Sequence, residues 1–218
     1  MPVFVDCIVV VDDGSVDDTA ARVERLGSAR VHLLRQVQSR GVGAAIYRGY
    51  AHAAALGAFV IAVMAGDGQM HPDDLPAVLG PVLRGEADYV KGNRVAHPSA
   101  LRVMPIGRRV GTTALAWLTR VITGLPALSD AQCGFTAVAA AALPALDLDA
   151  RWPGYGYPND LLGAVARAGL RLGEVTVRPV YRGEASGLGP RQLGTFARVF
   201  LGLARHRARS ARPRPAAP

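Results

Sequence analysis

The sequence predicts an α/β fold in which a mostly parallel sheet is flanked by helices. Residues 1–94 alternate short apolar runs rich in β-branched residues with longer segments of helical periodicity. This alternation is typical of parallel strands joined by right-handed helical crossovers. Two of the apolar runs end in acidic residues, at Asp12 and at Asp67. Open parallel sheets bind ligands at such strand ends, so we expect a ligand crevice there.

We predict the strands and helices from the spacing of apolar residues, and we place their ends at glycines, prolines and acidic residues. We expect strands over residues 7–11, 31–34, 59–64, 89–91, 135–138 and 172–180. We expect helices over residues 19–26, 42–56, 72–83, 110–125, 159–168 and 196–203. The run CIVVV at 7–11 and the run FVIAVM at 59–64 are interpreted as buried strands.

Capping residues support these boundaries. Asp17 and Asp18 suit the start of the helix at 19–26, and Gly27 closes it. Pro72, followed by two aspartates, suits the first turn of the helix at 72–83. Gly169 closes the helix at 159–168.

Length and composition indicate a single globular domain. The chain has 218 residues, half of them apolar, which is enough for one substantial core. Its longest apolar runs are about eight residues, whereas a membrane-spanning helix needs roughly 18. Cys7 and Cys133 follow no metal or redox spacing, which favours a reducing cytosol. We expect one domain over residues 1–207 and a basic, disordered tail over residues 208–218.

The net charge of +8 is concentrated near the C-terminus. The arginines of this region are Arg191, Arg198, Arg205, Arg207, Arg209, Arg212 and Arg214. A basic tail binds anionic lipid or nucleic acid, or stays solvated. This one lacks the interleaved aromatic residues of a single-strand binding platform, so we expect no nucleic-acid partner.

Asp67 and Gln69 are two residues apart on an extended strand exit, so both side chains can point the same way. Oxygen ligands of this kind suit Mg²⁺ or Mn²⁺, which take their remaining ligands from phosphates and water. Alternatively, Asp13 and Asp67 simply cap turns or helices. Two acidic strand ends, with Arg94 at a third, favour the ligand site.

Six segments together resemble a known enzyme family. They are VVVDDGSVDDT, RGVGAAIYRGYAHA, FVIAVMAGDGQMHPDDL, DYVKGNR, SDAQCGFTAV and GYGYPNDLL. This set is similar to the inverting glycosyltransferases of family 2, and within it to the dolichol-phosphate mannosyltransferase-like, or polyprenyl-phosphate glycosyltransferase, branch. The resemblance covers roughly residues 3–182 and implies a GT-A fold.

The resemblance implies roles for the donor-side residues. Asp12, Asp13 and Gly14 would bind the nucleotide, while Asp67 and Gln69 would hold Mg²⁺ or Mn²⁺ on the diphosphate. The family's acidic motif has a further aspartate where this chain has Ala65. The implied reaction moves a hexose from a nucleotide sugar, of the GDP-mannose or UDP-glucose type, to a polyprenyl or dolichyl phosphate with inversion.

The acceptor side is implied in the same way. A lipid phosphate is already an anion at neutral pH, so its attack needs no general base, and catalysis rests on positioning and electrostatic stabilisation. The family's acceptor-phosphate arginines correspond to Arg94 and to Arg108 or Arg109. Asp130 matches an acidic position near the acceptor, and with Asp67 and Arg94 it completes the expected catalytic set. Alternatively, Arg108 and Arg109 form a solvated helix start, and Asp130 caps a turn.

Residues 110–125 form a broad apolar helix. It is either part of the core or an interfacial helix where the lipid tail arrives, for which Trp117 and Arg120 are suited. We expect a cytoplasmic protein, peripheral at the inner face of the cell membrane, with an integral-membrane partner as a further expectation.

Family members begin with one more strand and helix before the strand that ends in DDGS. Here six residues precede that strand. We therefore expect a sheet one strand short and a nucleotide site lacking one wall. The alternative function is a catalytically impaired homologue that acts as a membrane-surface or partner-binding subunit.

Overall fold

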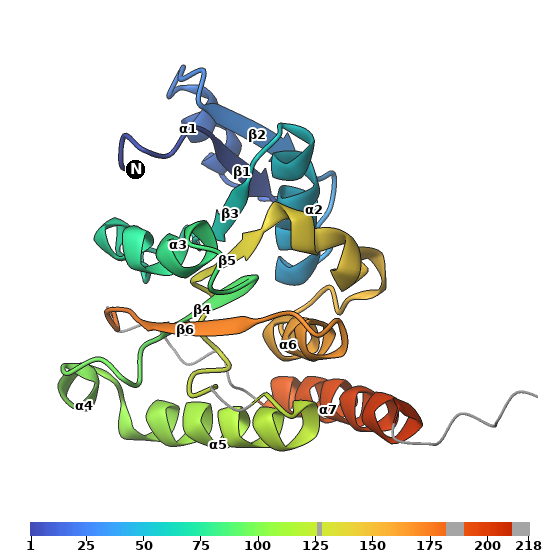
Figure 1. The fold of residues 1–218 in the computed structure, drawn as a ribbon. Coiled ribbons are helices and arrows are strands. Elements are labelled where there is room, and N and C mark those ends of the chain that lie inside the picture. The colour runs from blue at the N-terminus through green and yellow to red at the C-terminus, as the bar shows by residue number, and fades with distance from the viewer. Residues whose placement is uncertain (126–127, 182–189, 211–218) are drawn as a thin grey trace, which may run out of the picture.

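The computed structural model describes residues 1–125, 128–181 and 190–210 (Figure 1). The strands are β1 Ile8–Asp12, β2 Val31–Arg35, β3 Val60–Val63, β4 Tyr89–Asn93, β5 Thr136–Ala139 and β6 Leu172–Thr176. The α-helices are α1 Thr19–Glu24, α2 Val42–Ala55, α3 Leu75–Leu83, α4 Ala100–Val103, α5 Ile106–Thr123, α6 Tyr157–Arg167 and α7 Pro190–Ser210. Short 3₁₀ helices are η1 Pro72–Asp74, η2 Ala140–Leu146 and η3 Leu148–Ala150.

The strands form two sheets, with the orders β1-β2 and β3-β5-β4-β6. β1 runs parallel to β2, and β4 runs parallel to β6. β5 lies between β3 and β4 and is antiparallel to both. The α/β class is confirmed, but the expectation of parallel pairing through residue 94 is wrong where β5 separates β3 from β4. The hydrophobic pattern of β3 and β4 does not indicate this long-range pairing.

β1 and β3 belong to different sheets and are not hydrogen-bonded to each other. Each therefore has a paired neighbour on one side only, and the residues of both strands are largely half-buried. Phe59, which precedes β3, is 72% exposed. The prediction that these two runs are fully buried strands is therefore wrong. By contrast, β4 has a neighbour on each side, and all five of its residues are buried.

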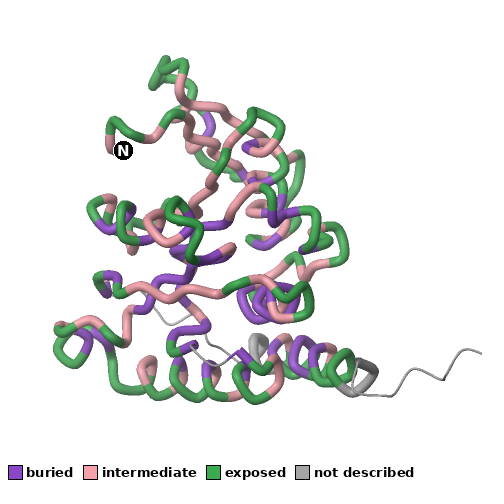
Figure 2. Tube along the Cα trace, viewed as in Figure 1, coloured by how far each residue is buried: buried purple, intermediate pink, exposed green. Residues whose placement is uncertain are grey.

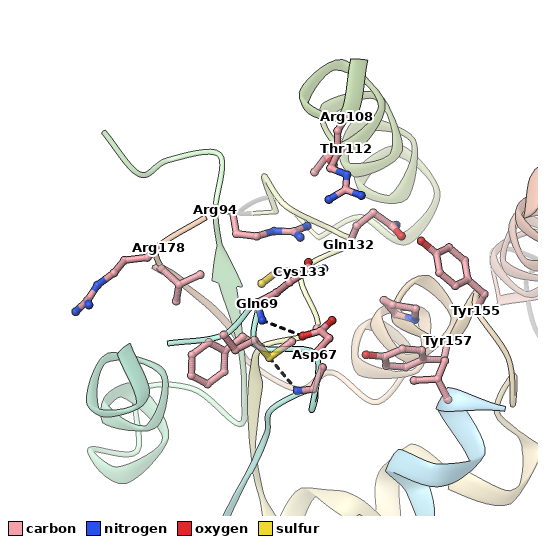
Figure 3. A pocket seen from close by; sticks show the side chains of 17 residues that line it. Asp67, Gln69, Arg94, Arg108, Thr112, Gln132, Cys133, Tyr155, Tyr157 and Arg178 are labelled. Carbon is pink, nitrogen blue, oxygen red and sulfur yellow. Dashed lines mark hydrogen bonds between the residues drawn. The ribbon is translucent and has the colours of Figure 1, made fainter. Parts of the chain in front are cut away.

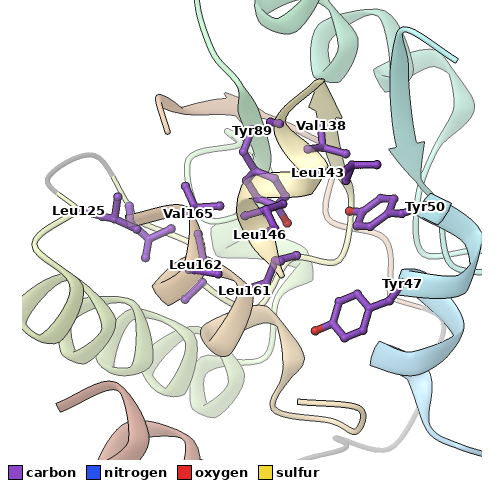
Figure 4. Packing of buried hydrophobic residues seen from close by; sticks show 14 of the residues in the cluster. Tyr47, Tyr50, Tyr89, Leu125, Val138, Leu143, Leu146, Leu161, Leu162 and Val165 are labelled. Carbon is purple, nitrogen blue, oxygen red and sulfur yellow. The ribbon is translucent and has the colours of Figure 1, made fainter. Parts of the chain in front are cut away.

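The largest cluster of buried residues joins α2, β4, β5 and α6 (Figure 4). Tyr89 and Val138 come from the sheet, while Leu161 and Leu162 come from the inward face of α6. Both leucines are fully buried. Replacing a leucine in such a place by alanine costs about 2–5 kcal/mol of stability. This cluster therefore forms a core that ties the two helices to the sheet.

α5 and α7 lie side by side in a layer beside α6 at one end of the molecule (Figure 1). Phe196, Val199, Phe200 and Leu203 of α7 are buried in this contact. The helix expected over residues 196–203 is confirmed but runs from Pro190 to Ser210, so the prediction that disorder begins at residue 208 is wrong for residues 208–210. Residues 211–218 lie outside the described part of the chain. Within the described residues, no helix combines the length and apolar character needed to cross a membrane.

Candidate active site

One cavity, of about 330 Å³, opens beyond the ends of β3 and β4 (Figure 3). Its polar lining residues are Asp67, Gln69, Arg94, Arg108, Thr112, Gln132, Tyr155, Tyr157 and Arg178. Ala65, Cys133 and Gly134 contribute to its walls. Its volume is at the lower end of the range found for ligand pockets in proteins. Asp67 is the only acidic residue in this described lining, and no histidine lines it.

Asp67 reaches the cavity on the turn that follows β3. Gly68 adopts a φ of 72°, a left-handed conformation that favours glycine, and so lets the chain turn here. The Asp67 carboxylate accepts a hydrogen bond from the backbone N–H of Gln69, 3.0 Å away (Figure 3). One Asp67 oxygen thereby orders the turn, while the exposed carboxylate remains accessible to a ligand.

Arg94 follows β4 directly and forms an ion pair with Asp130. Its Nε donates to Asp130 Oδ2 over 2.8 Å, and its Nη2 donates to Oδ1 over 3.0 Å. The Asp130 side chain is fully buried, whereas that of Arg94 is 16% exposed and lines the cavity. A guanidinium has five N–H donors. Two of them hold Asp130, so three remain for a ligand.

Asp130 is the centre of a buried polar network. Besides Arg94, its carboxylate accepts the backbone N–H groups of Gln132 and Cys133, 3.1 and 3.0 Å away. Burial raises the pKa of Asp130, but the charge and hydrogen bonds of Arg94 outweigh it and hold the pKa below its ordinary value. The structure thus places Asp130 behind Arg94, where it fixes both the guanidinium and the turn at 130–134.

Two further charged residues brace this turn. Lys91 is buried in β4, and its Nζ donates to the backbone carbonyl oxygen of Cys133 over 2.5 Å. Burial lowers the pKa of Lys91. Glu174 of β6 accepts the backbone N–H groups of Ser129 and Asp130 at 2.7 and 2.9 Å. Burial raises the pKa of the Cys133 thiol, which therefore stays protonated and is no nucleophile at neutral pH.

Arg94 and Arg108 reach toward the same space near Gln132, whereas Arg178 points away from it (Figure 3). Arg108 comes from the first turn of α5, and its guanidinium carbon lies 4.7 Å from the centre of the Tyr181 ring. Arg178 is engaged by Asp74, with 3.0 Å between Nε and Oδ1. Arg109 is not among the residues that line the cavity. Of the two adjacent arginines predicted from sequence, Arg108 is therefore the one at the site.

Asp12, Asp13 and Gly14 do not line this cavity. Asp13 holds the loop between β2 and α2, accepting hydrogen bonds from the side chains of Gln36 and Ser39 and from the backbone N–H groups of Arg40 and Gly41. Burial opposes ionisation of Asp13, but these bonds prevail and lower its pKa.

The two neighbours of Asp13 have structural roles of their own. Asp12 is buried and accepts the backbone N–H of Ser15 at 2.8 Å. Gly14 has a φ of 79°, and a Cβ there would lie 2.8 Å from the backbone N of Ser39. All three residues thus shape the strand end, and their contact with a nucleotide stays a prediction.

Sequence reasoning missed a hydrogen-bond chain that links the site to α5. Gln132 Nε2 donates to Asn159 Oδ1, and Asn159 Nδ2 donates to Thr119 Oγ1, each over 2.7 Å. Thr119 Oγ1 in turn donates to the carbonyl oxygen of Leu115 over 2.7 Å. Asn159 and Thr119 are both fully buried. A polar residue on each of two apolar helices was the only sequence signal for this contact.

The donor set at the cavity matches a metal that is held mainly by its substrate. Among the described residues, no three histidine, cysteine or acidic side chains come together as a metal site. Asp67 offers a carboxylate and Gln69 an amide oxygen, both at the cavity. Mg²⁺ commonly takes only one or two protein carboxylates together with phosphate oxygens and water. These residues therefore fit a divalent cation that arrives with a diphosphate.

The family model for glycosyl transferase family 2 matches residues 5–143. One relative, UDP-N-acetylglucosamine–dolichyl-phosphate N-acetylglucosaminyltransferase of Methanococcus voltae, is 30% identical over 81% of this chain and 75% of its own length. The undecaprenyl-phosphate mannosyltransferase of Micrococcus luteus is 33% identical over 80% of this chain and 72% of its own length.

A solved structure shares the fold. Glucosyl-3-phosphoglycerate synthase from Mycobacterium tuberculosis, in complex with Mn²⁺, uridine diphosphate and glucosyl-3-phosphoglycerate, superposes with a TM-score of 0.66 at 24% identity. The match covers 93% of this chain and 68% of that protein. The order of elements described above therefore occurs in a known glycosyltransferase.

Proposed function

Because the chain belongs to glycosyl transferase family 2 and is a glycosyltransferase, we propose that it moves a hexose from a nucleotide sugar to a polyprenyl or dolichyl phosphate, with inversion. The named acceptors of the two relatives, dolichyl and undecaprenyl phosphate, support a lipid phosphate. Their sugars differ, so the donor class is proposed only as a GDP-mannose or UDP-glucose type. We propose a cytoplasmic protein, peripheral at the inner membrane face.

The observation that carries this proposal is the pairing of opposite charges across one cavity. Asp67 stands on one side, while Arg94 and Arg108 reach in from β4 and α5 (Figure 3). Arginine forks bind phosphate oxygens with charge-assisted hydrogen bonds. We assign the acceptor phosphate to Arg94 and Arg108, and the donor diphosphate to the side of Asp67 and Gln69.

The chemistry needs positioning more than proton transfer. A phosphate oxygen that attacks the anomeric carbon is already ionised at neutral pH, so the proposed reaction needs no general base. Arg94 would orient that oxygen, and Asp130 would act behind it as a positioning residue. A divalent metal, when bound through Asp67 and Gln69, would neutralise charge on the departing nucleoside diphosphate.

The proposal is tested by product analysis. Purified protein is incubated with undecaprenyl phosphate, Mn²⁺ and radiolabelled GDP-mannose, UDP-glucose or UDP-N-acetylglucosamine, and the lipid fraction is extracted. We expect label in the lipid fraction with at least one donor, and loss of label when Mn²⁺ is chelated. Label that appears only in free sugar with every donor would contradict a lipid-phosphate acceptor.

One observation favours a second candidate, the catalytically impaired homologue. Ala65 stands where the family has an aspartate, and Asp67 is the only carboxylate in the described cavity lining. Such a protein would act as a membrane-surface or partner-binding subunit. Calorimetry with GDP and UDP in the presence of Mn²⁺ distinguishes the two, because tight nucleotide binding is expected only of the enzyme.

A further inference from the structure

We infer that the outward face of α4, α5 and α7 docks on the surface of an anionic lipid bilayer. This basal face comprises the exposed apolar residues Leu101, Val103, Ile106, Val110, Trp117, Val121 and Leu201. The inference rests on the proposed lipid-phosphate acceptor, whose isoprenoid tail stays in a membrane. It specifies which surface meets that membrane and which lipid charge it prefers.

The outward side of α5 is mostly apolar, whereas the exposed side of a surface helix is ordinarily polar. Ile106, Val110, Trp117 and Val121 are spaced so that they share one side of the helix. They are 73%, 61%, 62% and 50% exposed. Figure 2 shows exposed segments along the outer edge of the layer that α5 and α7 form. A tryptophan amid aliphatic residues is typical of helices that lie in a membrane interface.

The helices that form this face carry positive charge without negative charge. No acidic residue occurs from Tyr89 to Ser129, nor anywhere in α7. Apart from Arg108, which lines the cavity, the arginines on these helices whose side chains are described are Arg102, Arg109, Arg120, Arg198, Arg205 and Arg207. None of them forms an ion pair within the described part of the chain. Arg207 donates to the carbonyl oxygen of Val121, so the basic end of α7 lies beside the end of α5.

This charge pattern selects a bilayer over a second copy of the chain. A symmetric dimer through the basal face would bring two sets of arginines together, which opposes association. An anionic leaflet instead attracts each arginine near its surface. In a bilayer, lipid headgroups can pair with the arginines of this face while acyl chains contact its apolar side chains.

The basal layer is continuous with the active site. Arg108 and Thr112 of α5 line the catalytic cavity. One turn further on, Leu115, Leu118 and Ile122 line an apolar groove of about 530 Å³ together with Phe196 and Phe200 of α7. A lipid phosphate held at Arg94 and Arg108 would thus have an apolar path for its tail within the layer that meets the bilayer.

Vesicle binding of the full chain tests the inference without any substrate. Sucrose-loaded vesicles of phosphatidylcholine, with and without phosphatidylglycerol, are sedimented with wild type, Val110→Asp, Leu201→Asp and Leu83→Asp. Leu83 is the matched control, because it is a helical leucine as exposed as Leu201, at 59% against 56%, but lies on α3. We expect anionic vesicles to bind wild type and Leu83→Asp alike. We expect Val110→Asp and Leu201→Asp to bind about ten-fold or more weakly.

A Trp152→Phe variant leaves Trp117 as the single tryptophan reporter. We expect its emission to shift to the blue on anionic vesicles, and the shift to weaken as salt screens the arginines. Equal binding of all variants, no preference for phosphatidylglycerol, or a dimer in solution that Val110→Asp dissociates would each overturn the inference. Transfer to a soluble short-chain isoprenyl phosphate is measured separately. Its failure would reject the proposed function rather than the docking surface.

Discussion

Arg94 and Asp130 meet in a two-bond ion pair in which the carboxylate is fully buried and the guanidinium reaches the cavity. The two residues are 36 positions apart, and the pair joins the end of β4 to the turn before β5. The buried carboxylate fixes one edge of the arginine, which leaves its other edge preorganised for an anion.

Asp130→Asn removes the negative charge while keeping the shape of the side chain. We expect a loss of about 3–5 kcal/mol in the free energy of unfolding, because Arg94 then loses its buried counter-charge. We also expect a raised KM for the lipid phosphate. Urea denaturation and initial-rate kinetics measure the two effects.

Asp88→Asn is the matched control for that experiment. Asp88 also pairs with an arginine, Arg171, over 2.7 Å, but the Arg171 side chain is 57% exposed. Exposed pairs contribute about 1 kcal/mol or less. Equal stability losses in the two variants would contradict a special role for the buried pair.

Ala65→Asp tests whether a second carboxylate strengthens the metal site. Ala65 is exposed at the cavity wall two residues before Asp67, so an aspartate there meets no packing obstacle. We expect Mn²⁺ to bind roughly ten-fold more tightly in the presence of a nucleoside diphosphate, which corresponds to ~1.4 kcal/mol. Calorimetry measures this affinity, and an unchanged value would place the metal elsewhere.

Thr119→Val tests the hydrogen-bond chain from the site to α5. Valine matches threonine in shape but leaves the buried Asn159 amide without its acceptor, so we expect a loss of about 1–3 kcal/mol in stability. Thr119→Ser retains the hydroxyl and should lose less. If these hydrogen bonds also position the turn that holds Gln132, Thr119→Val raises the acceptor KM while Thr119→Ser does not. Identical kinetics in both variants would limit the hydrogen bonds to a role in stability.

Stability should depend on acid pH through Asp13 and Asp130. Both have a folded-state pKa below the ordinary value of 3.8, because hydrogen bonds and, for Asp130, the charge of Arg94 outweigh burial. The unfolded chain therefore binds protons first as pH falls. Stabilisation is fully present above pH 3.8 and is lost as pH falls through the lower folded values. Urea midpoints measured from pH 7 to pH 3 should show this decline, and Asp13→Asn should make it shallower.

Much of the fold was predictable because it is recorded in local patterns. The membership of family 2, inferred from the DDGS, GDGQ and GNR segments, is confirmed by the family model over residues 5–143. β1, α2, β3 and β4 lie within two residues of their expected bounds. The insertion of antiparallel β5 between β3 and β4 was not predictable, because strand order depends on pairing between segments far apart in the chain.

The sequence predicted which residues line the site better than it predicted the role of each residue. Asp67, Gln69, Arg94 and Arg108 do line one cavity, as their motifs indicated. The sequence could not reveal that Asp130 is fully buried behind Arg94. Nor could it reveal that both carboxylate oxygens of Asp13 accept hydrogen bonds from the β2–α2 loop. Burial and hydrogen bonding depend on tertiary contacts, so these details required the structure.

The most direct test of the central claim is the rate of hexose transfer to undecaprenyl phosphate in Asp67→Asn and Arg94→Met, each compared with wild type. Asp67→Asn should lower the rate about 100-fold or more at saturating acceptor, because the charged oxygen that supports the diphosphate is removed. Arg94→Met should act chiefly through the acceptor KM. Nucleoside diphosphate binding, measured in parallel by calorimetry, should weaken only in Asp67→Asn. Wild-type transfer rates in both variants would contradict the assignment of this cavity as the active site.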